Sequence, residues 1–132
     1  MKKKEEQTPA KSELILYQTE DGKTRIEVKL QDETVWLSQK LMAELFQSTK
    51  QNISLHLKNV FDEGELRPEG TVAKSATVQT EGSKQVTRDI EFFNLDMIIS
   101  VGYRVKSVVA TRFRIWATQR LREYIVKGFV LD

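Results

Sequence analysis

Five polar residues that could hydrogen-bond to the edges of DNA bases lie close together near the middle of the chain. They are Thr49, Lys50, Gln51, Asn52 and Ser54. Gln and Asn side chains can make two hydrogen bonds to adenine, Lys can donate to guanine, and Ser or Thr can bond phosphates or either base. The same polar types also suit the start of any helix, so a second interpretation stays open, in which they only begin a helix.

The residues around this group predict two short helices. Ser38 suits the N-cap of a first helix that ends near Phe46. A second helix, at about 49–61, follows with Ser48 or Thr49 as its N-cap. Apolar residues recur at helical spacing in both segments: Leu41, Met42, Leu45 and Phe46, then Ile53, Leu57, Val60 and Phe61. In a helix-turn-helix the first residues of the second helix meet the base edges, which favours the base-reading interpretation.

Strands are predicted on both sides of these helices. Residues 14–30 predict a hairpin that turns at Asp21-Gly22, with Ile26, Val28 and Leu30 alternating with polar residues in its second half. Residues 35–37 continue it as a third strand of a β-meander. Residues 71–80 and 85–93 predict a second, polar hairpin that follows the helices as a wing. Lys74, Lys84 and Arg88 on this wing are candidate contacts to the DNA backbone. A capping ribbon without a ligand is the alternative.

The C-terminal part predicts a helical pair with a basic surface. The first helix begins at about Asn94 and ends near Gly102-Tyr103, and the second spans about 107–127 with Gly128 just past its end. Between residues 101 and 127 there are seven Lys or Arg residues and one acid, Glu123. Such asymmetry indicates an anionic partner. Arg112, Arg114 and, on the reading helix, Lys58 are further candidates for phosphate contacts.

The chain offers little for catalysis. It has no cysteine and one histidine, His56, so zinc sites built from several such residues are excluded. No phosphate-binding glycine loop and no nucleophile elbow occur. We therefore expect no enzymatic activity, no catalytic residue, no metal and no cofactor. No apolar run approaches the roughly 20 residues that cross a membrane, and the N-terminus lacks a secretory signal, so we expect a cytoplasmic protein.

These patterns together predict a polar, disordered segment at 1–12 and one α+β domain at 13–132. The domain would comprise an N-terminal β-meander, a helix-turn-helix with a β-hairpin wing, and a C-terminal helical pair. The predicted function is the binding of double-stranded DNA, by a homodimer formed through the long last helix. A protein-interaction or oligomerisation module is the main alternative, and a toxin or nuclease component is the third.

Two long stretches resemble a known family of bacterial proteins. "TVWLSQKLMAELFQSTKQNISLHLKNVFDEGEL" and "FFNLDMIISVGYRVKSVVATRFRIWATQRLREYIVKGFVLD" are similar to the N-terminal domain of the RhuM family, over about 13–132. The Phe-Arg-x-Trp helix more loosely resembles the BRO-type N-terminal domain of phage antirepressors. The resemblance implies a DNA-binding, regulatory module of a mobile element or virulence-associated locus. Because RhuM-like proteins are usually longer, it also implies either a domain of a longer protein or a shortened gene product.

Overall fold

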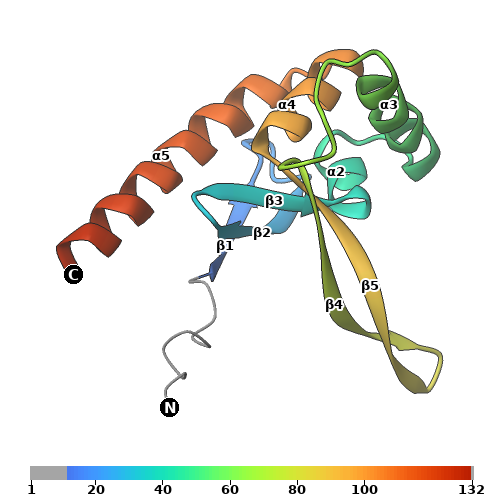
Figure 1. The fold of residues 1–132 in the computed structure, drawn as a ribbon, viewed down its shortest axis with the longest axis horizontal. Helices are drawn as coiled ribbons and strands as arrows, with labels where there is room; N and C mark the ends of the chain where they lie inside the picture. The colour runs from blue at the N-terminus through green and yellow to red at the C-terminus, as the bar shows by residue number, and fades with distance from the viewer. Residues whose placement is uncertain (1–11, 132) are drawn as a thin grey trace.

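A computed structural model describes the backbone of residues 12–131, and the side chains as far as Tyr124. This part of the chain is of mixed α and β type, with one five-stranded antiparallel sheet in the order β1-β2-β3-β5-β4 and four helices (Figure 1). The elements are β1 (Ser12–Gln18), β2 (Arg25–Gln31), β3 (Thr34–Ser38), α2 (Gln39–Leu45), α3 (Lys50–Asp62), β4 (Val72–Glu81), β5 (Lys84–Asn94), α4 (Leu95–Arg104) and α5 (Val109–Leu131). Residues 1–11 of the segment expected to be disordered lie outside the described residues, and Ser12 already belongs to β1.

The first three strands form the predicted meander. β2 and β3 are joined by Asp32 and Glu33, whose φ angles of 55° and 62° are those of a two-residue hairpin turn. The turn between β1 and β2 is longer than predicted, because pairing stops at Gln18 and Arg25. Within that loop Asp21 Oδ1 accepts a hydrogen bond from the Lys23 amide at 2.9 Å, and Gly22 has a φ of +74°.

The second hairpin is part of the same sheet, which the sequence did not predict. β5 pairs with β3 through three residue pairs, Trp36 with Asn94, Leu37 with Phe93 and Ser38 with Phe92. Beyond this junction, β5 pairs only with β4, and the two strands extend from the body of the molecule as an arm (Figure 1). We call residues 74–91 the β4–β5 ribbon.

The helices around the predicted turn begin where their caps predict. Ser38 Oγ accepts a hydrogen bond from the Leu41 amide at 3.2 Å, and Thr49 Oγ1 accepts one from the Asn52 amide at 3.0 Å. Each hydroxyl therefore satisfies one of the amides that a helix start leaves without a partner. At the other end of the chain the prediction was wrong, since α5 continues to Leu131 and includes Gly128. The glycine there does not end the helix.

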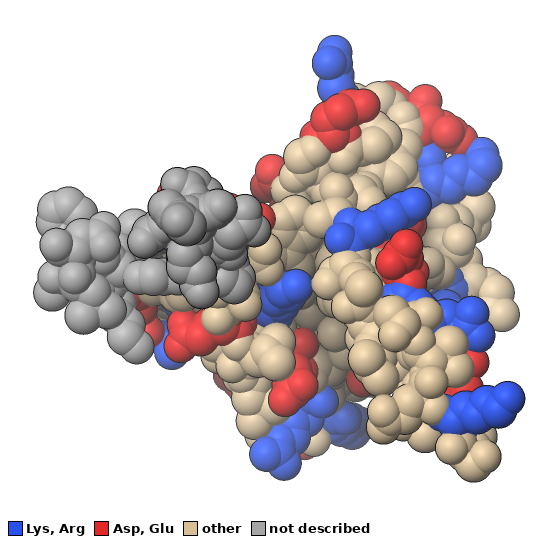
Figure 2. Space-filling view, turned by 60° about the horizontal axis from the view of Figure 1, so that its bottom comes forward, with Lys and Arg blue, Asp and Glu red and all other residues tan. Residues whose placement is uncertain are grey.

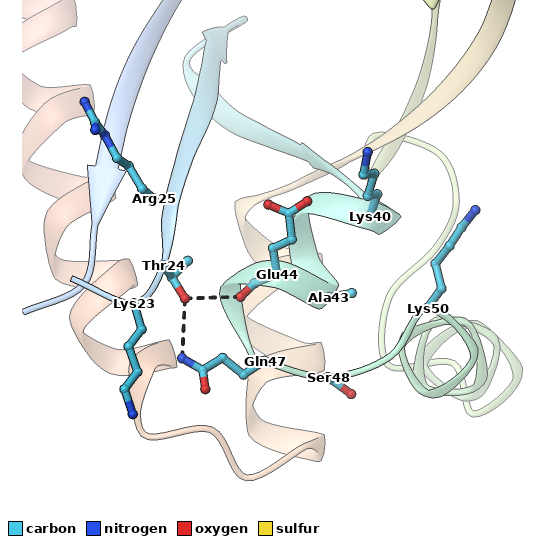
Figure 3. Close-up of a pocket in the computed structure, with 9 residues that line it drawn as sticks. All are labelled: Lys23, Thr24, Arg25, Lys40, Ala43, Glu44, Gln47, Ser48 and Lys50. Atoms are coloured by element: carbon cyan, nitrogen blue, oxygen red, sulfur yellow. Dashed lines mark hydrogen bonds between the residues drawn. The ribbon is translucent and has the colours of Figure 1, made fainter. Parts of the chain in front are cut away.

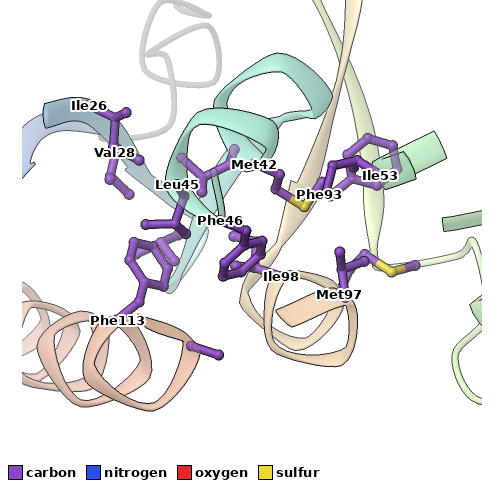
Figure 4. Packing of buried hydrophobic residues seen from close by; sticks show 14 of the residues in the cluster. Ile26, Val28, Met42, Leu45, Phe46, Ile53, Phe93, Met97, Ile98 and Phe113 are labelled. Atoms are coloured by element: carbon purple, nitrogen blue, oxygen red, sulfur yellow. The ribbon is translucent and has the colours of Figure 1, made fainter. Parts of the chain in front are cut away.

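The core lies between one face of the sheet and the helices (Figure 4). Alternate residues of β2, Ile26, Val28 and Leu30, are buried on this face. From α5, Phe113 is fully buried and its ring meets that of Tyr17 edge-on, with ring centres 5.1 Å apart. α4 packs closely against the first turn of α5 at Gly102, where a Cβ atom would lie only 2.7 Å from the Ala110 side chain. The core thus holds both C-terminal helices against the sheet.

Candidate nucleic-acid interface

The five residues predicted to read bases all lie at or just after the start of α3, and all five are exposed. Thr49 is the N-cap, and the Asn52 side-chain amide donates to Ser48 Oγ at 2.9 Å. Gln39 of α2 donates to the Lys50 carbonyl oxygen at 2.9 Å, which ties the first turn of α3 to α2. The structure therefore brings the five residues together on one exposed end of a helix with a defined start.

The opposite side of α3 is held in the core. Ile53, Leu57 and Val60 are buried, whereas Leu55 is 52% exposed and faces away from the core. His56 is half-buried on the flank of the helix. The predicted division of α3 into an apolar side and a polar front is confirmed for these residues, with Leu55 on the outer side.

An ion-pair cluster fixes the far end of α3. Arg104 at the end of α4 donates to Glu63 Oε1 at 2.8 Å and to Glu65 Oε1 at 2.7 Å. Its side chain is only 23% exposed. The Arg104 guanidinium, and after it the Ser100 hydroxyl, hold the pKa of the Glu65 carboxyl below its usual value. Two of the acidic residues that follow α3 are therefore paired with a base of α4, at the end of α3 remote from Thr49.

Replacing Arg104 by glutamine is expected to lower the stability of the domain, because Glu63 and Glu65 lose their cationic partner. The pKa of Glu65 is lower in the folded state than in the unfolded state, so this contribution is present above the unfolded pKa of about 4.3. It is lost as the pH falls through the folded pKa. Urea unfolding from pH 7 to pH 3 should show the difference between the two proteins shrinking below about pH 4.3.

Lys106→Gln, which removes a charge from an exposed residue just after α4, is the matched control. A gap between wild type and Arg104→Gln that stayed constant down to pH 3 would contradict the assignment of this stability to the carboxylates.

Three of the residues predicted to contact phosphates are already paired with acids. Lys58 bonds Asp62 one turn later in α3, and Arg112 bonds Glu20 in the β1–β2 loop. Arg88 donates to both carboxylate oxygens of Glu81 across the ribbon, at 2.9 and 2.8 Å. Contact between any of these bases and a phosphate would compete with the existing ion pair.

The β4–β5 ribbon carries balanced charge. Its bases are Lys74, Lys84 and Arg88, and its acids are Glu81, Asp89 and Glu91. Lys84 is exposed next to the tip and Lys74 is exposed near the base. The ribbon is therefore polar and not cationic, so general electrostatic attraction does not distinguish it as a contact surface.

The basic helix α5 is placed apart from α3. Arg112 reaches the loop beside β1, at the opposite edge of the sheet from β4. Figure 1 shows α5 running to one side of the molecule while α3 and the ribbon lie on the other. Arg114 is exposed on the same helix. The structure thus does not gather Arg112 and Arg114 with the residues at the start of α3.

Three basic residues that the sequence did not indicate, Lys23, Arg25 and Lys40, lie with Lys50 beside the start of α3. An open recess is lined by Lys23, Arg25, Lys40 and Lys50, together with Thr24, Ala43, Glu44, Gln47 and Ser48 (Figure 3). We call it the α2 recess. These four bases come from the β1–β2 loop, β2, α2 and α3, so their spacing in the sequence does not indicate that they lie together. On the face shown in Figure 2, Lys and Arg alternate with Asp and Glu and form no continuous basic surface.

Among the described residues, no three His, Asp or Glu side chains are placed to hold a metal ion. No described helix is long and apolar enough to cross a membrane.

Comparison with known proteins supports the resemblance over part of the chain. Residues 70–132 match the model of the virulence protein RhuM family. The matched segment contains β4, β5, α4 and α5, and it begins after α3 ends. No curated protein and no solved structure matches the chain.

Proposed function

We propose that this chain, whose residues 70–132 match the model of the virulence protein RhuM family, binds double-stranded DNA and serves as a regulatory module of a mobile-element or virulence-associated locus. The observation that carries the proposal is the exposed polar start of α3 on a helix whose other side is buried. Lys50, Gln51 and Asn52 can present donors and acceptors to base edges there. The proposal assigns no catalytic step and no cofactor to the chain.

In this proposal α2 and α3 act as a helix-turn-helix. Four residues, Phe46 to Thr49, join them, and Gln47 adopts a φ of +52° at the bend. α3 would enter the major groove with its first residues, as the second helix of such motifs does. The β4–β5 ribbon would be the wing, with Lys74, Lys84 and Arg88 beside the duplex, and α4 with α5 would form the C-terminal pair.

Fluorescence anisotropy on a labelled pool of random duplexes, followed by selection for a preferred site, tests the proposal. Binding should weaken steeply with salt, with log K falling by about 0.9 per tenfold rise in salt for each neutralised phosphate. If the protein binds no duplex even at low salt, that result would contradict DNA binding and would favour the protein-interaction module.

A protein-interaction or oligomerisation module is the second candidate, and one surface favours it. Val108, which directly precedes α5, and Ile115 in α5 are 87% and 47% exposed, beside the half-buried Trp116. They line a shallow recess with Tyr17 and with Arg112. Homodimerisation through this part of α5 is compatible with DNA binding, because dimers bind two half-sites. Light scattering on the wild type and on the double variant Val108→Ser, Ile115→Ser would measure whether this surface forms a homodimer.

A further inference from the structure

We propose that the α2 recess is a binding site for the phosphodiester backbone, which it would grip next to the groove entered by α3. This inference rests on the proposed function and adds to it a contact surface on the side of the β1–β2 loop. The ligand class is a polyanionic nucleic-acid strand, recognised without regard to sequence. Lys50 belongs both to the recess and to the start of α3, so the two surfaces are continuous.

The floor of the recess is held in place by hydrogen bonds. Thr24 is 4% exposed, and its hydroxyl donates to the Glu44 carbonyl oxygen at 3.3 Å and accepts from Gln47 Nε2 at 3.5 Å. Figure 3 shows these bonds linking the end of the β1–β2 loop to the end of α2. Lys23 and Arg25, the two neighbours of Thr24, therefore project from a fixed position relative to α2.

The charges around the recess favour an anion. Four bases line it, Lys23, Arg25, Lys40 and Lys50, against one acid, Glu44. Figure 3 shows Lys40 and Lys50 extending from the two helices and Lys23 from the loop on the other side. Arg25 and Lys40 are exposed at the surface. Three of the other candidate bases, Lys58, Arg88 and Arg112, already bond an acid, with which a phosphate would have to compete.

The shape of the recess indicates an extended ligand. It opens broadly to solvent, and bases from four separate elements are distributed around it. A small free phosphate would be held at one point, whereas a nucleic-acid strand presents a charge every few ångströms along its length. In helix-turn-helix proteins the first helix crosses the DNA backbone, and α2, which contributes Lys40, is the equivalent helix in the proposed arrangement.

Lys23→Gln, Arg25→Gln is the test variant, because both residues are exposed and neither is assigned to base reading. If each base neutralises one phosphate, the salt slope should decrease by about 1.8 and affinity in 0.1 M salt should fall by up to about 60-fold. The loss should be equal on a preferred and on a random duplex. Glu44→Gln, which removes the one acid of the recess, should raise the affinity.

Arg122→Gln, Lys106→Gln is the matched control, since it also removes two exposed positive charges, from α5 and from the α4–α5 turn. Circular dichroism melts confirm that each variant is folded before binding is measured. If the wild type binds duplexes and the recess variant binds equally well, the recess is not a contact site and the proposed function stands. A control that loses as much as the recess variant also overturns the inference, because total charge then explains the loss. If the wild type does not bind, both proposals fail.

Discussion

Loss of discrimination between DNA sequences is the expected result of replacing Gln51 and Asn52 by alanine. Both side chains are exposed in the first turn of α3, where the proposed helix-turn-helix meets base edges. Each good side-chain-to-base pairing contributes about 1–3 kcal/mol of discrimination. The double variant should therefore lose on the order of this amount for each pairing on the preferred duplex, and much less on random duplexes. Parallel anisotropy titrations at one salt concentration would measure both losses.

Two further variants separate base reading from other effects of this change. Asn52 also donates to Ser48 Oγ at 2.9 Å, so part of a loss could come from a weaker start of α3. Ser48→Ala removes that bond and leaves both amide side chains in place. Gln119→Ala removes an exposed amide from α5 and should not alter binding. Equal losses on preferred and random duplexes in the double variant would show that Gln51 and Asn52 do not read bases.

Phe113→Ala is expected to have the largest effect on stability. The Phe113 side chain is fully buried, and its ring centre lies 5.1 Å from that of Tyr17 and 5.6 Å from that of Trp116. Removing a buried phenyl ring loses its burial and leaves a cavity, at a cost of about 3–5 kcal/mol. Urea unfolding followed by tryptophan fluorescence would measure this, since Trp116 is in contact with the ring.

Thr111→Ala, two residues earlier on the same helix, is the control for local change in α5. The Thr111 side chain is exposed, so its truncation should cost far less. A similar loss in the two variants would mean that α5 does not pack on the sheet through Phe113. In that case Phe113 would not be what holds α5 and its basic residues on the side of the molecule away from α3.

The parts of this fold that the sequence predicted depend on neighbours along the chain. Ser38 and Thr49 cap the helices that follow them because a short hydroxyl side chain can reach an amide three residues later. Gly82, with a φ of +64°, turns between β4 and β5 at the predicted position. The buried side of α3 follows from apolar spacing alone. Each of these depends on residues within about one or two turns of one another.

Prediction failed where distant segments meet, and also at the end of α5. The pairing of β5 with β3 joins Phe93 to Leu37, and neither strand carries a mark of its partner. Gly128 suggested a helix end, but α5 continues through it. The acids after α3 had no visible partner in the sequence until the structure placed Arg104 beside Glu63 and Glu65.

The sequence by itself determined the starts of α2 and α3, the turn of the β4–β5 hairpin and the polar front of α3, because hydrogen bonds and apolar spacing over a few residues specify them. Only the tertiary structure decided which basic residues lie close to the polar start of α3. It placed Arg112 beside Glu20 on the far side of the sheet, and it brought Lys23, Arg25 and Lys40 to Lys50. The physical reason is that residues on different elements become neighbours only when the sheet and helices pack around a shared core.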